Sequence, residues 1–190
     1  MAVQTVSETE LIAGAQNGDR NAFSELVRMH AQGVLNLIYR MCGDVQLAED
    51  AAQETFIRAW QNLPTYRPQT SLRNWLYRIA FNAATDMLRK ERRILPDDIG
   101  DLNLTDGQAG LETIVSQQER ITLVQNAILS LPDASRAVLV LREYEALSYQ
   151  EISSTLDIPV GTVMSRLNYA RNLLKTMLRP HLSVLEVDHV

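Results

Sequence analysis

The chain has 190 residues with a formal net charge of −5, 46% hydrophobic residues, 8 glycines and 6 prolines. The hydrophobic share excludes a disordered chain, the single cysteine (Cys42) excludes an internal disulfide framework, and no apolar run approaches the ~20 residues of a membrane span. We therefore expect a cytoplasmic, all-α protein of one large or two small domains, without membrane insertion.

Capping residues and helical spacing predict the first two helices. Ser7 and Glu10 form a capping-box pattern that opens a helix at residue 8. A second helix over 20–42 ends at Gly43, and Asp44 can cap the helix that follows. The second helix has apolar and weakly polar residues every three or four positions, which form one buried face: Phe23, Leu26, Val27, His30, Val34, Leu37, Ile38 and Met41.

The next two helices complete a first bundle. A helix over 45–63 is stopped by Pro64, and a loop then leads to Thr70 or Ser71, either of which can open a helix over 72–93. The buried side of this last helix is expected to carry Leu72, Leu76, Ile79, Ala83 and Leu88.

A stretch rich in Asp, Gly and Asn separates two helical sets. We expect an N-terminal domain over 1–93, an acidic linker over 94–110 and a C-terminal domain over 111–190. In the C-terminal domain a helix over 133–147 leads into the stretch "SYQEISSTLDIPVGTVMSRL" at 148–167.

This stretch has the pattern of a helix-turn-helix. Ser148 and Glu151 repeat the capping box, and Pro159 marks the corner before the second short helix. Short polar groups followed by Arg suit base edges in the major groove and then phosphates. An ordinary helical hairpin with a solvated basic face is the alternative. The expected exposed face of the second helix carries Thr162, Ser165, Arg166, Tyr169 and Arg171.

Charge is distributed in blocks. Residues 66–93 and 160–179 are basic, whereas 94–119 contains six acidic residues and neither Lys nor Arg. Such asymmetry indicates polyanionic partners for the basic blocks, even though the total charge is negative.

Aromatic and basic residues alternate in the loop before the fourth helix and in that helix. Tyr66 lies beside Arg67 in a proline-bounded loop, where a ring has little to pack against, so it could stack on a splayed-out single-stranded base. Trp75 is at helical spacing with Ile79, and core packing and base stacking both stay open for it. Asn82 could bond a base edge or be a plain exposed residue.

Four polar residues of the third helix form an acidic cluster, and three of them are carboxylates. They could be acid/base catalysts, metal ligands, a solvated face or a docking surface for a basic protein. No histidine lies nearby in the sequence to complete a catalytic or metal site. The cluster consists of Glu49, Asp50, Gln53 and Glu54.

Three stretches in this order resemble bacterial sigma factors of the extracytoplasmic-function class. They are "AEDAAQETFIRAW", "TSLRNWLYRIAFNAATDMLRKERR" and "LSYQEISSTLDIPVGTVMSRLNYARNLL", and the resemblance runs from about residue 8 to residue 178. It implies a factor that is not an enzyme and needs no cofactor or metal. It implies as partners core RNA polymerase, promoter DNA and an anti-sigma factor, with no small-molecule substrate.

The resemblance also implies roles for individual residues. Core polymerase would be bound by Glu49, Asp50, Gln53 and Glu54. The −10 element and the melted non-template strand would be contacted by Tyr66, Arg67, Trp75, Arg78, Asn82, Arg89, Lys90, Arg92 and Arg93. The −35 element would be read by Thr162, Ser165, Arg166, Tyr169 and Arg171. The acidic linker would thread toward the polymerase active-site cleft, or would be a simple spacer.

Two other classes of protein stay open. A stand-alone helix-turn-helix regulator would normally dimerise on duplex DNA, yet the sequence has no dimerisation heptad and no ligand-binding domain. A metal-dependent hydrolase built on Glu49, Asp50 and Glu54 would lack a nucleophile–base pair and a glycine-rich phosphate loop.

Overall fold

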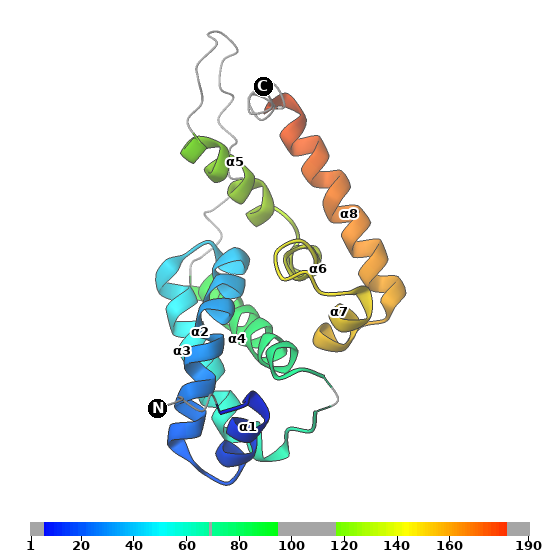
Figure 1. The fold of residues 1–190 in the computed structure, drawn as a ribbon. Coiled ribbons are helices and arrows are strands. Elements are labelled where there is room, and N and C mark those ends of the chain that lie inside the picture. The colour runs from blue at the N-terminus through cyan, green and yellow to red at the C-terminus, as the bar shows by residue number, and fades with distance from the viewer. Residues whose placement is uncertain (1–5, 69, 95–116, 182–190) are drawn as a thin grey trace.

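The computed structural model describes residues 6–68, 70–94 and 117–181, with side chains of 92–94 excepted. The described part of the chain is all-helical, with no strand (Figure 1). This confirms the expected fold class. The α-helices are α1 (Glu8–Gln16), α2 (Arg20–Cys42), α3 (Val45–Asn62), α4 (Leu72–Ile94), α5 (Gln117–Leu129), α6 (Asp133–Glu143), α7 (Tyr149–Leu156) and α8 (Val160–Leu178), and the 3₁₀ turns are η1 (Leu63–Thr65) and η2 (Arg179–His181).

Local capping sets the ends of the N-terminal helices. The Ser7 side chain accepts from the Glu10 backbone N–H while Glu10 bonds back, so the capping box is confirmed. Gly43 ends α2 in the left-handed region at φ 76°, and the Asp44 side chain accepts from the Leu47 N–H to start α3. Ser71 opens α4, since its hydroxyl accepts from the Asn74 N–H.

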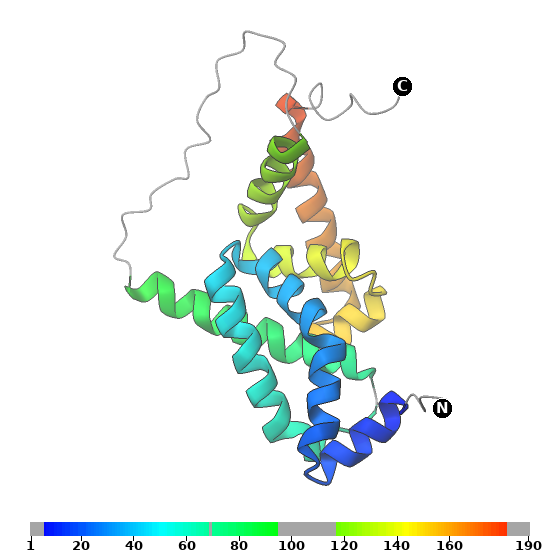
Figure 2. The ribbon, with the colours of Figure 1, turned by 60° about the vertical axis from the view of Figure 1, so that its left-hand side comes forward.

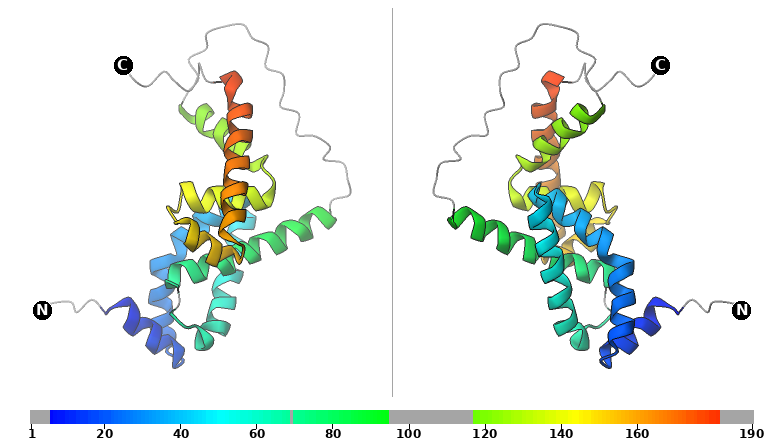
Figure 3. Two further views of the ribbon diagram at one scale, coloured as in Figure 1. Left: turned by 90° about the vertical axis from the view of Figure 1, so that its right-hand side faces the viewer. Right: turned by 90° about the vertical axis from the view of Figure 1, so that its left-hand side faces the viewer.

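Helix α4 is buried only along its first half. Leu72, Leu76, Ala80 and Ala84 are buried among α2 and α3. Its C-terminal part projects beyond the helices that surround the first half (Figures 2 and 3). The projecting part therefore offers its sides to a partner.

Helix α6 forms the centre of the C-terminal group, and seven consecutive residues from Ser135 to Leu141 are buried. The expected end of this helix at residue 147 is wrong, because α6 stops at Glu143. The chain turns there with Ala146 at φ 55°, and the Arg142 side chain donates to the Leu147 carbonyl across the turn. Neither Gly nor Asn marks this turn in the sequence.

The corner between α7 and α8 follows the expected helix-turn-helix pattern. Ser148 and Glu151 form the second capping box. Asp157 ends α7 at φ 55°, and the Ser153 hydroxyl donates to the Ile158 carbonyl across the corner at 2.6 Å. These local bonds set the angle at which α8 leaves.

The two helical groups share one connected apolar core. Among the described residues, their main contacts are those of the end of α2 with α5 and α6 and those of the first half of α4 with α7. Arg136 of α6 supports the first contact, because its buried guanidinium donates to the Met41 carbonyl at the end of α2. The linker expected at 94–110 lies outside the described residues, except for its first backbone position.

Candidate nucleic-acid interface

A polar cleft of about 660 Å³ lies between α4, the loop before it and α7. Ser154 and Thr155 of α7 form part of its lining, so the C-terminal group contributes one wall. The cleft brings together five of the nine residues expected to contact the −10 element: Tyr66, Arg67, Trp75, Arg78 and Asn82.

The Tyr66 ring is packed, and the expectation that it has little to pack against is wrong. Only 5% of the residue is exposed, and its ring lies 5.0 Å from the Trp75 ring, centroid to centroid. Its hydroxyl donates to the Thr70 carbonyl at 2.7 Å, and its own carbonyl accepts from Gln16 at 3.0 Å. Tyr66 lies inward because Gln16 of α1 bonds its backbone and Trp75 of α4 packs on its ring. Both partners are more than one helix turn from Tyr66 in the sequence, so the loop sequence does not indicate them.

The other expected −10 residues lie farther along α4. Arg89 is exposed and follows Arg78 and Asn82 at helical spacing, so the three share one face. Lys90 lies elsewhere, beside Leu47 and Asp50 at a small depression between α3 and α4. Arg92 and Arg93 belong to the helix backbone, and their side chains lie outside the described residues.

The acidic cluster on α3 is mostly free of intramolecular partners among the described contacts. Glu49, Asp50 and Gln53 are exposed, whereas Glu54 accepts a 2.7 Å hydrogen bond from Arg58. Arg58 also donates to Asp86 of α4 at 3.2 Å. These two bonds, that of Glu54 first, raise the pKa of the Arg58 guanidinium.

A shallow apolar groove adjoins this cluster, which the charge pattern of the sequence did not indicate. It is lined by Gln53, Phe56, Ile57 and Trp60 of α3 together with Phe23 and Val27 of α2. Ile57 is 46% exposed, which is high for a large apolar side chain in a packed helix pair. The sequence could have indicated the groove through Ile57, a large apolar residue one helix turn after the polar Gln53.

One side of α8 carries four of the five residues expected to read the −35 element, of which Ser165 and Tyr169 are exposed and Thr162 and Arg166 are half-buried. Thr162, Ser165, Arg166 and Tyr169 recur at three- and four-residue spacing and share one side of the helix. Arg171 does not belong with them. It follows Thr162 by nine residues, about half a turn round the helix, and its guanidinium bonds Glu143 of α6 at 2.6 Å. The Glu143 hydrogen bond raises the pKa of Arg171.

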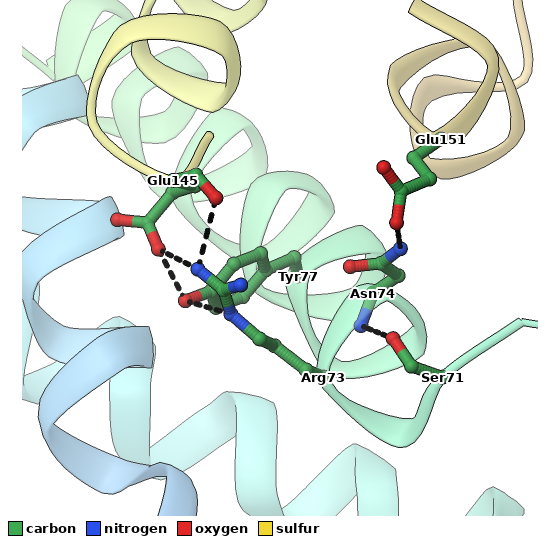
Figure 4. A network of polar contacts seen from close by, with 6 residues as sticks. All are labelled: Ser71, Arg73, Asn74, Tyr77, Glu145 and Glu151. Carbon is green, nitrogen blue, oxygen red and sulfur yellow. Dashed lines mark hydrogen bonds and ion pairs between the residues drawn. The ribbon is translucent and has the colours of Figure 1, made fainter. Parts of the chain in front are cut away.

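Sequence reasoning also missed a polar network between α4 and the C-terminal helices. It joins Arg73, Asn74, Tyr77 and Arg78 to Glu145, Glu151 and Asp157. Figure 4 shows its two larger parts. Its members lie far apart in sequence, so periodicity carries no signal of it.

Among the described residues, no group of three or more His, Cys, Asp and Glu side chains is arranged to hold a metal ion. Within the same residues, no helix combines the length and the apolar character that a membrane span needs.

Comparisons with known proteins place the helices in a family. Sigma-70 region 2 matches residues 26–94, and sigma-70 region 4 matches residues 121–174. RNA polymerase sigma-H factor of Pseudomonas aeruginosa is 36% identical over 182 residues, which cover 91% of this chain and 94% of the relative. ECF RNA polymerase sigma factor SigW of Bacillus subtilis is 38% identical over 181 residues, covering 88% and 95%. The chain belongs to the extracytoplasmic-function (ECF) class of RNA polymerase sigma factors.

Solved structures agree with this assignment. CnrH in complex with the cytosolic domain of CnrY is 25% identical to this sigma factor, with a TM-score of 0.68 over 90% of this chain and 96% of CnrH. The sigma factor RpoE from Bartonella quintana, in complex with the anti-sigma factor NepR, has the same fold, with a TM-score of 0.65 at 22% identity, covering 88% and 98%.

The family defines the general role of this sigma factor. It is a regulatory factor for promoter-directed transcription initiation by RNA polymerase, and its partners are the polymerase and promoter DNA. The family assignment therefore favours a sigma factor over the two alternatives, a stand-alone helix-turn-helix regulator and a metal-dependent hydrolase. The acidic cluster and the cleft residues of α4 lie within region 2, whereas the α7–α8 corner lies within region 4.

Proposed function

We propose that this sigma factor opens promoters by dividing the work between two DNA-binding surfaces. Region 4 reads the −35 element with the face of α8 that carries Arg166. Region 2 holds the −10 element and the melted non-template strand along the cleft and the Arg89 side of α4. The two surfaces belong to an N-terminal domain over 1–93 and a C-terminal domain over 111–190, joined by the linker at 94–110.

One observation carries this proposal above the others. Aromatic, cationic and amide side chains gather at a single cleft, with Trp75, Arg78 and Asn82 from α4 and Arg67 from the loop. A single strand needs such a set, because its bases stack on rings and its phosphates pair with guanidinium groups. Duplex DNA alone would need only the α8 face.

Core polymerase is proposed to bind the acidic cluster on α3. The exposed carboxylates of Glu49 and Asp50 would pair with a basic surface, and the adjoining groove around Ile57 would supply apolar contact. Protein–protein interfaces commonly combine an apolar centre with a polar rim. Glu54 contributes less charge, because Arg58 already neutralises it.

An anti-sigma factor is the proposed regulatory partner. CnrH and the Bartonella sigma factor RpoE were both solved with a second protein, CnrY and NepR respectively. The first likeness is at 25% identity over nearly the whole chain, which supports the same kind of partner here.

A test starts from a duplex library with randomised segments, incubated with this chain, with bacterial core polymerase, or with both. Heparin-resistant complexes that require both proteins, with permanganate-reactive thymines, are the expected result. Tight sequence-specific binding by the chain alone, without dependence on core polymerase, would contradict it. Variants Glu49→Gln with Asp50→Asn should weaken core binding, whereas the matched control Glu8→Gln with Glu25→Gln should not, because these two residues pair with His30 and Arg28 and not with the cluster.

A further inference from the structure

A second stripe of exposed residues runs along α8, beside the side that carries Arg166. Met164 is 53% exposed, and Asn168, which follows one helix turn later on the same stripe, is exposed as well. The buried residues of α8 are Val163, Leu167 and Ala170. Since α8 lies along the edge of the C-terminal group (Figure 1), this stripe faces outward.

Both side chains of the stripe are available to a partner. The Asn168 amide accepts a bond of 3.5 Å from Asn172, which is too long to hold it firmly. An Asn amide carries a donor and an acceptor side by side, so it can form two parallel hydrogen bonds with one planar group. Met164 is a flexible, polarizable apolar side chain that adapts to an apolar surface.

The charge around the stripe matches a polyanion. Residues 160–179 contain four basic residues and no acidic one. In the major groove of duplex DNA, adenine presents the N7 acceptor and the N6 donor that an Asn amide matches, and thymine presents an apolar C5-methyl group. An amide and an apolar side chain on one stripe of a basic helix therefore suit the two bases of A·T pairs.

We propose that Met164 and Asn168 are further specificity-determining residues, which select thymine and adenine in the −35 element. The Asn168 amide donates to N7 of an adenine and accepts from its N6 amino group, while the Met164 side chain packs on the C5-methyl group of a thymine. This inference rests on the proposed function of α8 as the helix that reads the −35 element.

The helix geometry limits how far apart the two bases lie. Four residues of an α-helix span about 6 Å, and successive base pairs are about 3.4 Å apart, so the adenine and the thymine lie about two base pairs from each other. The stripe ends at the next turn, because Arg171 bonds Glu143 there.

The test uses the holoenzyme and the −35 sequence that it prefers in the randomised duplex library. Each thymine of that element is replaced in turn by uracil, which lacks only the C5-methyl group. Each adenine is replaced in turn by 7-deazaadenine, which lacks only the N7 acceptor. Both replacements keep Watson–Crick pairing, and competition against the unmodified promoter measures the loss of affinity.

One uracil should weaken binding roughly fourfold, the effect of one buried methyl group. One 7-deazaadenine should weaken it roughly fivefold or more. Met164→Ala should abolish the effect of uracil and keep that of 7-deazaadenine, whereas Asn168→Ala should do the reverse. Met29→Ala and Asn21→Ala change exposed side chains of the same types on α2 and should keep both effects.

The outcomes separate this inference from the proposed function. A selective −35 element in which no uracil weakens binding, or in which the uracil effect persists in Met164→Ala, overturns the role of Met164. The same results with 7-deazaadenine and Asn168→Ala overturn the role of Asn168. A holoenzyme with no sequence preference at the −35 element would overturn the proposed function of α8 and this inference with it.

Discussion

The rings of Tyr66 and Trp75 lie 5.0 Å apart, centroid to centroid, with their planes tilted by 50°. This pair joins the loop before α4 to the first turn of that helix, and it builds the aromatic side of the cleft before any DNA is present. Under the proposed function, a base that enters the cleft would meet an aromatic pair already held in place by packing and by the hydrogen bond from Tyr66 to the Thr70 carbonyl.

Substitutions of Tyr66 should separate packing from hydrogen bonding. Tyr66→Phe removes only the bond to the Thr70 carbonyl and should lower the free energy of unfolding by about 1 kcal/mol. Tyr66→Ala also removes the ring and should cost about 3–5 kcal/mol. Urea denaturation measures both. The Phe variant should still open promoters with core polymerase, as measured by permanganate reactivity of thymines. Equal stability losses for the two variants would contradict the packing of the Tyr66 ring.

Tyr77 should make stability depend on pH in the alkaline range. Burial first, and then the hydrogen bond to Glu145, raise its pKa from 10.0 to about 12. The folded state favours the protonated phenol, so its contribution is fully present below pH 10 and is lost as the pH rises to about 12. The difference in unfolding free energy between wild type and Tyr77→Phe should therefore be constant below pH 10 and shrink above it. A constant difference up to pH 12 would exclude the shift.

Gly43 should resist substitution because of both its backbone and its neighbour. At φ 76° a side chain is strained, and a Cβ atom there would lie 2.5 Å from a methyl group of Leu129. Gly43→Ala should cost about 1–3 kcal/mol in urea denaturation. Gly161→Ala is the matched control, since nothing lies within 4 Å of its Cβ position and its φ is ordinary. The control should be neutral or slightly stabilising, and equal losses would count against the close contact.

Arg136 should be a large contributor to stability. Its buried guanidinium donates to the carbonyls of Met41 and Leu131 and pairs with Asp133 at 2.9 Å. Arg136→Met leaves these acceptors without their donor and should cost about 3–5 kcal/mol. The exposed Arg28, which pairs with Glu25 on the surface, is the control, and Arg28→Met should change stability by less than about 1 kcal/mol. Thermal and urea denaturation of both variants would show whether burial decides the difference.

The two arginines of α8 should differ in promoter readout. Arg166→Ala should weaken binding to promoters with a matched −35 element by about 1–3 kcal/mol, if Arg166 contacts a base. Arg171→Ala should leave selectivity unchanged, because Arg171 faces Glu143 on the other side of the helix. Competition between matched and mutated −35 elements for the holoenzyme measures both. A uniform loss on every sequence would assign Arg166 to phosphate instead.

The capping boxes and the glycine stop of α2 were predictable because each depends on atoms within a few residues. Ser7 with Glu10, Ser148 with Glu151, and Gly43 all behave as their local patterns indicate. The position of Arg171 opposite Thr162 could also be predicted, because nine residues along a helix place a side chain about half a turn away. The early end of α6 was not, because Ala146 adopts a left-handed turn that its residue type does not favour.

Helix order, the helix-turn-helix corner and the blocks of charge could be predicted from the amino-acid sequence, because short-range hydrogen bonds and residue types are enough for these. Three features needed the packed helices: the burial of the Tyr66 ring, the position of Lys90 beside Asp50, and the pairing of Arg73 with Glu145 across 72 positions. The physical reason is that these outcomes depend on which helices pack together. That choice comes from apolar burial summed over the whole core, and no single stretch of sequence carries it.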